Sequence, residues 1–185
     1  MSTDRPKPKP MWGPLALSLT LLVSGGLVWG MGSRVPAVGT PVEDFRLPDL
    51  DGNFQSLSQY RGNIVLINFW ATWCKGCTME MPAMQATYTK LHDKGFVVLA
   101  IKELEDDATA RKHIEHHGYT YPVLMDRDNT VANQFGVYGL PVSVFIDENG
   151  IVQQYIKGAL LTEEKILDVV VRIQKHEPRK AASLR

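Results

Sequence analysis

Cysteine is almost absent from this chain, whose 185 residues contain only Cys74 and Cys77. A structural zinc site usually needs four ligands, and neither a second cysteine pair nor an H-x₃₋₅-H partner at finger spacing is present. A purely structural disulfide is the other alternative, but a ring of four residues constrains the unfolded chain very little. The pair is therefore better interpreted as a redox-active dithiol.

An excess of charge of either sign is also missing. Lys plus Arg and Asp plus Glu both total 20, so charge gives no argument for nucleic acid as a partner. His113, His116 and His117 fall on one predicted helix and would be candidate metal ligands. Because no further ligand cluster accompanies them, we interpret them as a solvated polar face, and no metal or cofactor is expected.

Charged residues are entirely lacking between Pro10 and Ser33. The apolar segment from Met11 to Gly32, roughly 22 residues, meets the length of about 20 that a helix needs to cross the hydrocarbon core. Trp12 and Trp29 lie near its ends, where interfacial aromatic residues are common. We therefore expect one N-terminal transmembrane helix at 11–32.

The flanking charges predict the orientation of this anchor. Three basic residues lie within 1–10, whereas Arg34 alone follows closely, so the N-terminus is expected in the cytoplasm. This would make the chain a single-pass protein of the inner membrane with its catalytic domain in the periplasm. A cleaved signal peptide is the alternative, with Val35 and Ala37 as small residues for cleavage. We favour the uncleaved anchor because the apolar run exceeds a typical signal core and Pro36 interrupts the cleavage pattern.

Beyond the anchor, strands and helices alternate, which predicts an α/β fold with a mixed β-sheet flanked by helices. The expected organisation is a cytoplasmic tail at 1–10, the anchor at 11–32, a linker at 33–42, a folded domain at 43–176 and a flexible tail at 177–185. The expected elements are an N-terminal β-hairpin around Asp51-Gly52, buried strands at 64–67, 97–101 and 123–125, a hairpin of 142–146 with 151–156, and helices at 74–95, 106–117, 130–135 and from Thr162.

Cys74 is the predicted nucleophile. Its place at the start of a helix, beside Lys75, favours the thiolate over the thiol and lowers the pKa of this sulfur. Cys77 lies one turn later on the same helix face, where it can attack a mixed disulfide and release the substrate. Together the two residues would form a redox-active disulfide.

In this context the sequence resembles a known family. The segment Asn68 to Cys74 with Cys77, followed by the segment Val137 to Pro141, is similar to the thioredoxin fold. The spacing Cys-x-x-Cys-x-x-Glu-x-Pro and the opening Leu50-Asp51-Gly52 resemble more narrowly the membrane-anchored thioredoxin-like oxidoreductases of the TlpA, ResA and DsbE type, in the redoxin (AhpC-TSA) superfamily.

The resemblance implies roles for further residues. Pro141 matches the cis-proline of the family, whose loop leaves the backbone of Gly139 and Leu140 free to pair with an extended substrate, and Trp73 is expected to cover the disulfide and contact substrate. The alternatives are an ordinary turn proline and a core tryptophan.

Glu80 lies three positions after Cys77, so its carboxylate would share a helix face with that sulfur and exchange a proton with it. A solvated surface glutamate is the alternative. Asn68 occupies the position at which cytosolic thioredoxins carry a buried aspartate, which favours Glu80 as the proton acceptor. Glu105 resembles a second acidic position of the subgroup.

These residues predict a protein-disulfide reductase outside the cytoplasm, and the resemblance implies a role in cytochrome c maturation. Its partners would be disulfide-containing extracytoplasmic proteins such as apocytochrome c, and a membrane-embedded thiol electron donor. A disulfide oxidase or isomerase is the nearest alternative, and a copper-delivery module is the non-enzymatic one. Peroxidase activity is disfavoured because Ala71 stands where the peroxiredoxin pattern requires threonine.

Overall fold

The computed structural model describes residues 35–103, 105–158 and 160–176. The expected tails at 1–10 and 177–185 and the expected anchor at 11–32 lie outside these residues. Within the described ranges, none of the helices combines the length and apolar character that a bilayer crossing requires.

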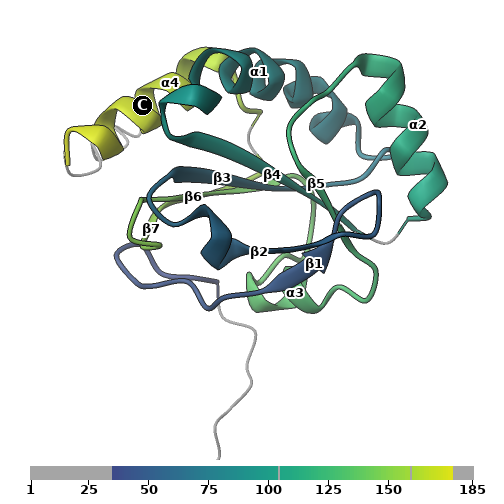
Figure 1. Cartoon of the computed structure of the whole chain (residues 1–185), viewed down its shortest axis with the longest axis horizontal. Coiled ribbons are helices and arrows are strands. Elements are labelled where there is room, and N and C mark those ends of the chain that lie inside the picture. Colours follow the sequence, from purple (N-terminus) through teal and green to yellow (C-terminus); the bar gives the residue numbers. More distant parts are fainter. Residues whose placement is uncertain (1–34, 104, 159, 177–185) are drawn as a thin grey trace, which may run out of the picture. The chain divides into compact units, whose positions relative to one another are not determined.

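A five-stranded mixed sheet forms the centre of the domain, in the order β5-β4-β3-β6-β7 (Figure 1). β3 runs parallel to β4, and β4 runs parallel to β5, whereas β6 is antiparallel to both β3 and β7. The prediction of an α/β fold with a mixed sheet is therefore confirmed. The strands are β3 Ile64–Trp70, β4 Phe96–Glu103, β5 Val123–Asp126, β6 Val142–Ile146 and β7 Val152–Lys157.

β3 is the central strand and is three residues longer than the expected 64–67, because Asn68 and Phe69 pair with both β4 and β6, and Trp70 pairs with β4. All of its residues are buried. Since successive side chains of a strand point to opposite faces, Leu66 and Trp70 join one apolar core while Ile67 and Phe69 join the other.

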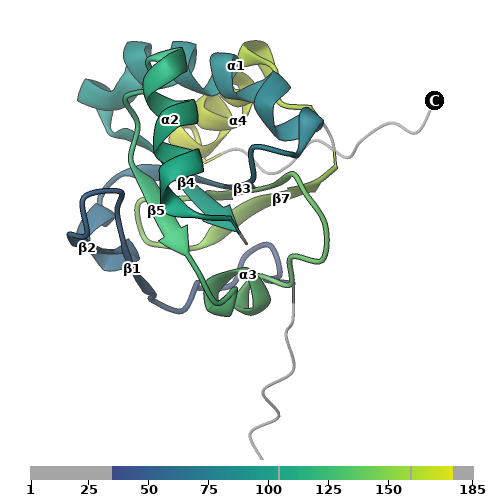
Figure 2. The ribbon, with the colours of Figure 1, turned by 90° about the vertical axis from the view of Figure 1, so that its right-hand side faces the viewer.

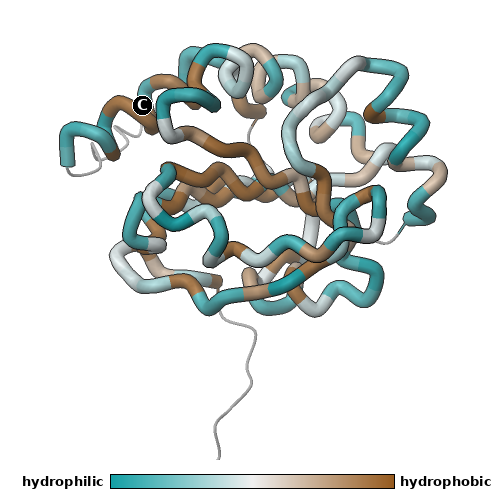
Figure 3. Tube along the Cα trace, viewed as in Figure 1, coloured by the Kyte–Doolittle hydropathy of each residue, from teal (hydrophilic) through white to brown (hydrophobic). Residues whose placement is uncertain are grey.

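Helices cover both faces of the sheet (Figure 2). α1, α2 and α4 lie on one face, and the short α3 lies on the other. The hydropathy colouring shows apolar strands between helices that present hydrophilic residues outward (Figure 3). The helices are α1 Lys75–Leu91, α2 Asp107–His117, α3 Thr130–Gln134 and α4 Glu163–Gln174, with 3₁₀ turns at Leu57–Tyr60 and His92–Lys94.

Capping residues begin two of these helices. The Asp106 carboxylate accepts the N–H of Thr109 at 2.8 Å, and the Thr162 hydroxyl accepts the N–H of Lys165 at 3.3 Å. α2 ends at Gly118, whose φ of +67° favours glycine.

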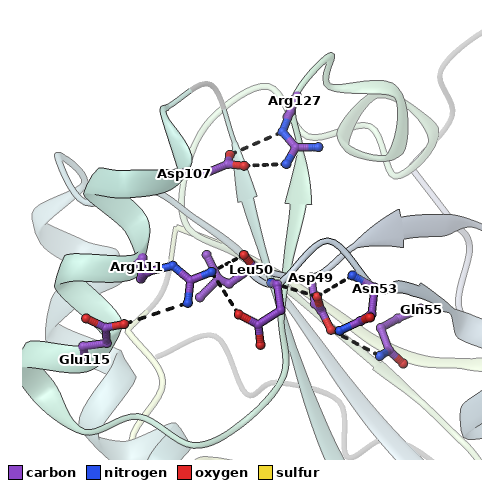
Figure 4. Close-up of polar contacts among 9 residues, drawn as sticks. Asp49, Leu50, Asn53, Gln55, Asp107, Arg111, Glu115 and Arg127 are labelled. Carbon is purple, nitrogen blue, oxygen red and sulfur yellow. Dashed lines mark hydrogen bonds and ion pairs between the residues drawn. The ribbon is translucent and has the colours of Figure 1, made fainter.

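The expected N-terminal hairpin is formed by β1 Arg46–Pro48 and β2 Phe54–Ser56, which pair only with each other as strands. Arg111 of α2 fastens the turn of this hairpin by donating to the carbonyl of Leu50 and, at 3.0 Å, to the carboxylate of Asp51 (Figure 4). The hairpin is thus held against the helical layer by a helix that lies 60 residues further along the chain.

Both lateral edges of the sheet receive an additional short contact. Asp49 forms a bridge with Leu124 on β5 at one edge, and Pro41 forms a bridge with Ile151 where β7 begins. The N–H of Gly39 donates to the carbonyl of Val152 at 2.7 Å. Part of the segment 33–42, expected as a linker, therefore pairs with the last hairpin of the domain.

Candidate active site

The two sulfurs lie where the chain passes from β3 into α1. Cys74 is the residue that precedes the helix, and its Sγ accepts the N–H of Cys77 at 3.2 Å. The two cysteines form a disulfide with their Cα atoms 5.3 Å apart. Two thiols at one helical turn can therefore close and reopen a bond with little movement of the backbone.

The two sulfurs differ in access to solvent. Cys74 is 8% exposed, whereas Cys77 is fully buried in the core beneath α1. The first turn of α1 contains no acidic residue, so nothing offsets the positive end of the helix dipole there. The sulfur of Cys74 is therefore the more accessible of the two.

Two surface features adjoin Cys74. Trp73 is 65% exposed, which rules out the alternative of a core tryptophan. The Leu140–Pro141 bond is cis, the isomer that the resemblance implies, and a Cβ placed on Gly76 would lie 3.4 Å from Cδ of Pro141. The proline ring thus packs against the turn between the cysteines, and the adjoining Gly139 is exposed.

Gly76 offers a test of this packing. A Cβ at this position would make only an ordinary contact with Pro141, so Gly76→Ala is expected to raise the free energy of unfolding by about 0.5–1 kcal/mol by restricting the unfolded chain. Urea denaturation of the oxidised protein measures the change. The control Gly118→Ala should destabilise, since φ is +67° there. Equal losses in both variants would contradict the prediction.

Glu80 is fully buried, so the alternative of a surface glutamate is wrong. Its Oε1 accepts from Asn68 Nδ2 at 2.7 Å and its Oε2 accepts the N–H of Leu161 at 3.0 Å. Burial raises the pKa of Glu80, and these two hydrogen bonds reduce that rise. A carboxyl group of raised proton affinity therefore lies on the helix of Cys77, one turn away.

Known proteins are similar to this chain over most of its folded domain. The family model described as the AhpC/TSA family matches residues 38–155. The chain belongs to this family. It is 41% identical over 128 residues to the thiol-disulfide oxidoreductase ResA of Geobacillus thermodenitrificans, covering 69% of this chain and 74% of that protein.

Solved structures of thiol:disulfide interchange proteins share the fold of this chain. A thioredoxin family thiol:disulfide interchange protein of Chlorobium tepidum matches with a TM-score of 0.68 and 26% identity, over 74% of this chain and 97% of that one. A second protein of the same organism, described as a thiol:disulfide interchange protein DsbE, matches with a TM-score of 0.65 and 30% identity, over 73% and 99%. The predicted thioredoxin-like fold is confirmed, and the chain is a protein-disulfide reductase of the thiol-disulfide oxidoreductase class.

Glu105 supports the turn before Cys74 in this AhpC/TSA family protein. Its carboxylate accepts the N–H of Thr72 at 3.1 Å and also the hydroxyl of Thr72. Within the described residues it makes no hydrogen bond with either cysteine. The contact links the chain that follows β4 to the segment between β3 and α1.

Glu103, the last residue of β4, was missed by the sequence analysis. It is buried and lies opposite the buried Asp126 in the pairing of β4 with β5. Burial, followed by the charge of Asp126, raises the pKa of Glu103 to about 7. The only signal in the sequence is the charged pair Lys102-Glu103 that ends an otherwise apolar strand.

The histidines of α2 do not form a metal site within the described part of the chain, where no three His, Cys, Asp or Glu side chains gather suitably. His113 is half-buried, and its ring centroid lies 5.5 Å from that of Trp70. Burial and the neighbouring His117 lower the pKa of His113. His113 therefore packs beside Trp70, whereas His116 and His117 form an exposed polar face of α2.

Proposed function

We propose that this reductase acts outside the cytoplasm, held in the inner membrane by residues 11–32, and that it reduces disulfides of extracytoplasmic proteins. The observation that carries the proposal is the pair of sulfurs at one helix start, with Cys74 8% exposed and Cys77 fully buried. The haem-binding CxxCH pair of apocytochrome c is the proposed substrate class. Its support is the likeness of the motif to the ResA and DsbE type of oxidoreductase.

In the proposed reaction the reduced enzyme enters with Cys74 as thiolate. This sulfur attacks one sulfur of the substrate disulfide, a mixed disulfide forms, and the other substrate sulfur leaves as thiolate and takes a proton from water. Cys77 then passes its proton to Glu80 and attacks Sγ of Cys74. The Cys74–Cys77 bond forms, the second substrate thiolate leaves and takes up that proton, and two electrons have moved to the substrate.

The surface beside Cys74 provides the proposed substrate contacts. Trp73 and the loop of Gly139, Leu140 and Pro141 adjoin the turn between the cysteines, where an extended polypeptide would pair with the exposed loop backbone. A further turnover needs the disulfide to be reduced again, and an oxidising compartment does not provide this. We therefore assign the electrons to a membrane-embedded thiol donor.

Trapping in living membranes tests the proposed substrates. In Cys77→Ser the mixed disulfide at Cys74 is not resolved, so bound partners should accumulate and be released by a thiol reductant. Mass spectrometry of the released proteins should find CxxCH-containing chains. The double variant with Cys74→Ser is the matched control, and equal recovery of the same partners from it would contradict the proposal.

The anchor has its own test, because a signal peptide predicts a different mature protein. N-terminal sequencing of the membrane fraction should give the original start of the chain. A mature start near Val38 would remove the anchor while leaving the redox chemistry of the domain in place.

A further inference from the structure

The side-chain amide of Asn68 connects Glu80 with the strand that follows the cis-proline. Its Nδ2 donates to Glu80 Oε1 at 2.7 Å and to Ser143 Oγ at 2.9 Å. Asn68 and Glu80 are fully buried, and Ser143 is 2% exposed. These three polar side chains, which we call the amide cluster, are packed away from water.

The nitrogen and the oxygen of the Asn68 amide differ in their hydrogen bonding. Both protons of Nδ2 are donated, whereas Oδ1 is buried and receives no hydrogen bond from the described residues. An unpaired buried polar atom costs about 1–3 kcal/mol. The oxidised state shown here thus holds Asn68 in the orientation that suits an ionised Glu80, since a carboxylate can only accept.

A half-turn of the amide about its last side-chain bond exchanges the positions of Oδ1 and Nδ2, so in either orientation one end of the amide lacks a partner among the described residues. Oδ1 then occupies the position of Nδ2, facing Glu80 Oε1 and Ser143 Oγ. It can accept the proton of a neutral Glu80 carboxyl group and the proton of the serine hydroxyl. The two orientations have the same shape, so the change needs no repacking of the core around β3.

The geometry points to Asn68 as the positioning residue that holds Glu80 in both of its protonation states, turning its amide when Glu80 takes the proton of Cys77 and turning back when that proton leaves. The Ser143 hydroxyl accepts a hydrogen bond from Nδ2 in one orientation and donates one to Oδ1 in the other. This inference rests on the proposed function, because it assigns to Asn68 a role in the resolving step. An aspartate at position 68 could not serve, since an ionised carboxylate has no proton to donate to Glu80.

Few other ionisable groups face Glu80. Cys77 lies on the same helix, and Tyr121, in the turn before β5, is buried and has a pKa raised by burial. From β3, β6 and the chain before α4, Glu80 meets the neutral Asn68, Ser143 beyond it and the N–H of Leu161. A change in the proton affinity of Glu80 is therefore attributable to the amide cluster.

A two-phase reaction of the full-length chain measures the resolving step. A reduced protein with only two cysteines reacts with an aromatic disulfide reagent in a bimolecular phase at Cys74, releasing one coloured thiolate. A unimolecular phase follows, in which Cys77 displaces the second. Stopped-flow absorbance across pH gives both rates separately.

Asn68→Asp should leave the first phase unchanged and move the midpoint of the second phase upward by at least about one pH unit. This corresponds to about a 10-fold slower resolution on the acidic limb of the profile. Asn149→Asp is the matched control, because it makes the same chemical change at an exposed turn between β6 and β7. A profile of Asn68→Asp equal to that of Asn149→Asp would overturn the inference.

Side-chain NMR of the unaltered reduced protein keeps the inference testable if Asn68→Asp fails to fold. The Nδ2 resonances of Asn68 should shift with the same midpoint as the Glu80 carboxyl carbon. Independent titration of the two groups would overturn it. Absence of the second thiolate from the wild-type chain would instead overturn the proposed function.

Discussion

Replacing Cys74 by serine is expected to remove the whole catalysed rate of disulfide reduction, a loss of about 10⁶-fold or more by the usual scale of enzymatic acceleration. A serine hydroxyl stays protonated near neutral pH, so the helix start would no longer present a charged nucleophile. The remaining sulfur does not compensate, because Cys77 is fully buried. Turnover of a disulfide-bonded protein, with a dithiol to regenerate the enzyme, measures the effect.

Cys77→Ser is the informative comparison, since it retains the accessible sulfur. This variant should react once with a disulfide reagent and release one thiolate per chain, whereas Cys74→Ser should release none in the same time. A rapid reaction of Cys74→Ser would show that the buried sulfur reaches substrate, contrary to the assignment of the two roles.

Stability should fall as pH rises through neutrality because of Glu103. The folded chain holds a proton on this carboxyl up to about pH 7, whereas the ordinary pKa is 4.5, so the folded state binds more protons between these values. The contribution is fully present below pH 4.5 and is lost as pH passes 7. The shift corresponds to about 3 kcal/mol in the free energy of unfolding.

Glu103→Gln removes this ionisation while nearly preserving size. The difference in unfolding free energy between the variant and the wild type should therefore change by about 3 kcal/mol in favour of the variant between acidic and mildly alkaline pH. Urea titrations at several pH values measure it. Glu43→Gln, at an exposed position, is the control, and parallel stability curves for the wild type and Glu103→Gln would contradict the prediction.

The position of the redox centre could be predicted from the sequence because it depends on local spacing. A Cys-x-x-Cys turn after an apolar strand specifies both the position of the disulfide and the helix on which it lies. Pro141 could be placed only through the resemblance, since the contact between its ring and the turn at Gly76 joins segments 65 positions apart in the sequence.

Burial of charged residues was the part that the sequence could not predict. Glu80 has the same spacing from Cys77 whether its face of α1 meets solvent or the sheet, and only the contacts with Asn68 and Leu161 decide between them. Glu103 appears as an ordinary strand end in the sequence. Its environment comes from its neighbour on β5, and parallel strand pairing has no local signature in the chain.

The short bridges at the two margins of the sheet have a consequence for solubility. Unpaired strand edges are templates for pairing with other molecules and so favour aggregation. The bridges of Asp49 with Leu124 and of Pro41 with Ile151 occupy part of each margin. A shortened chain that began after residue 42 would leave the start of β7 uncovered, and such a fragment should self-associate more readily than the domain that retains this segment.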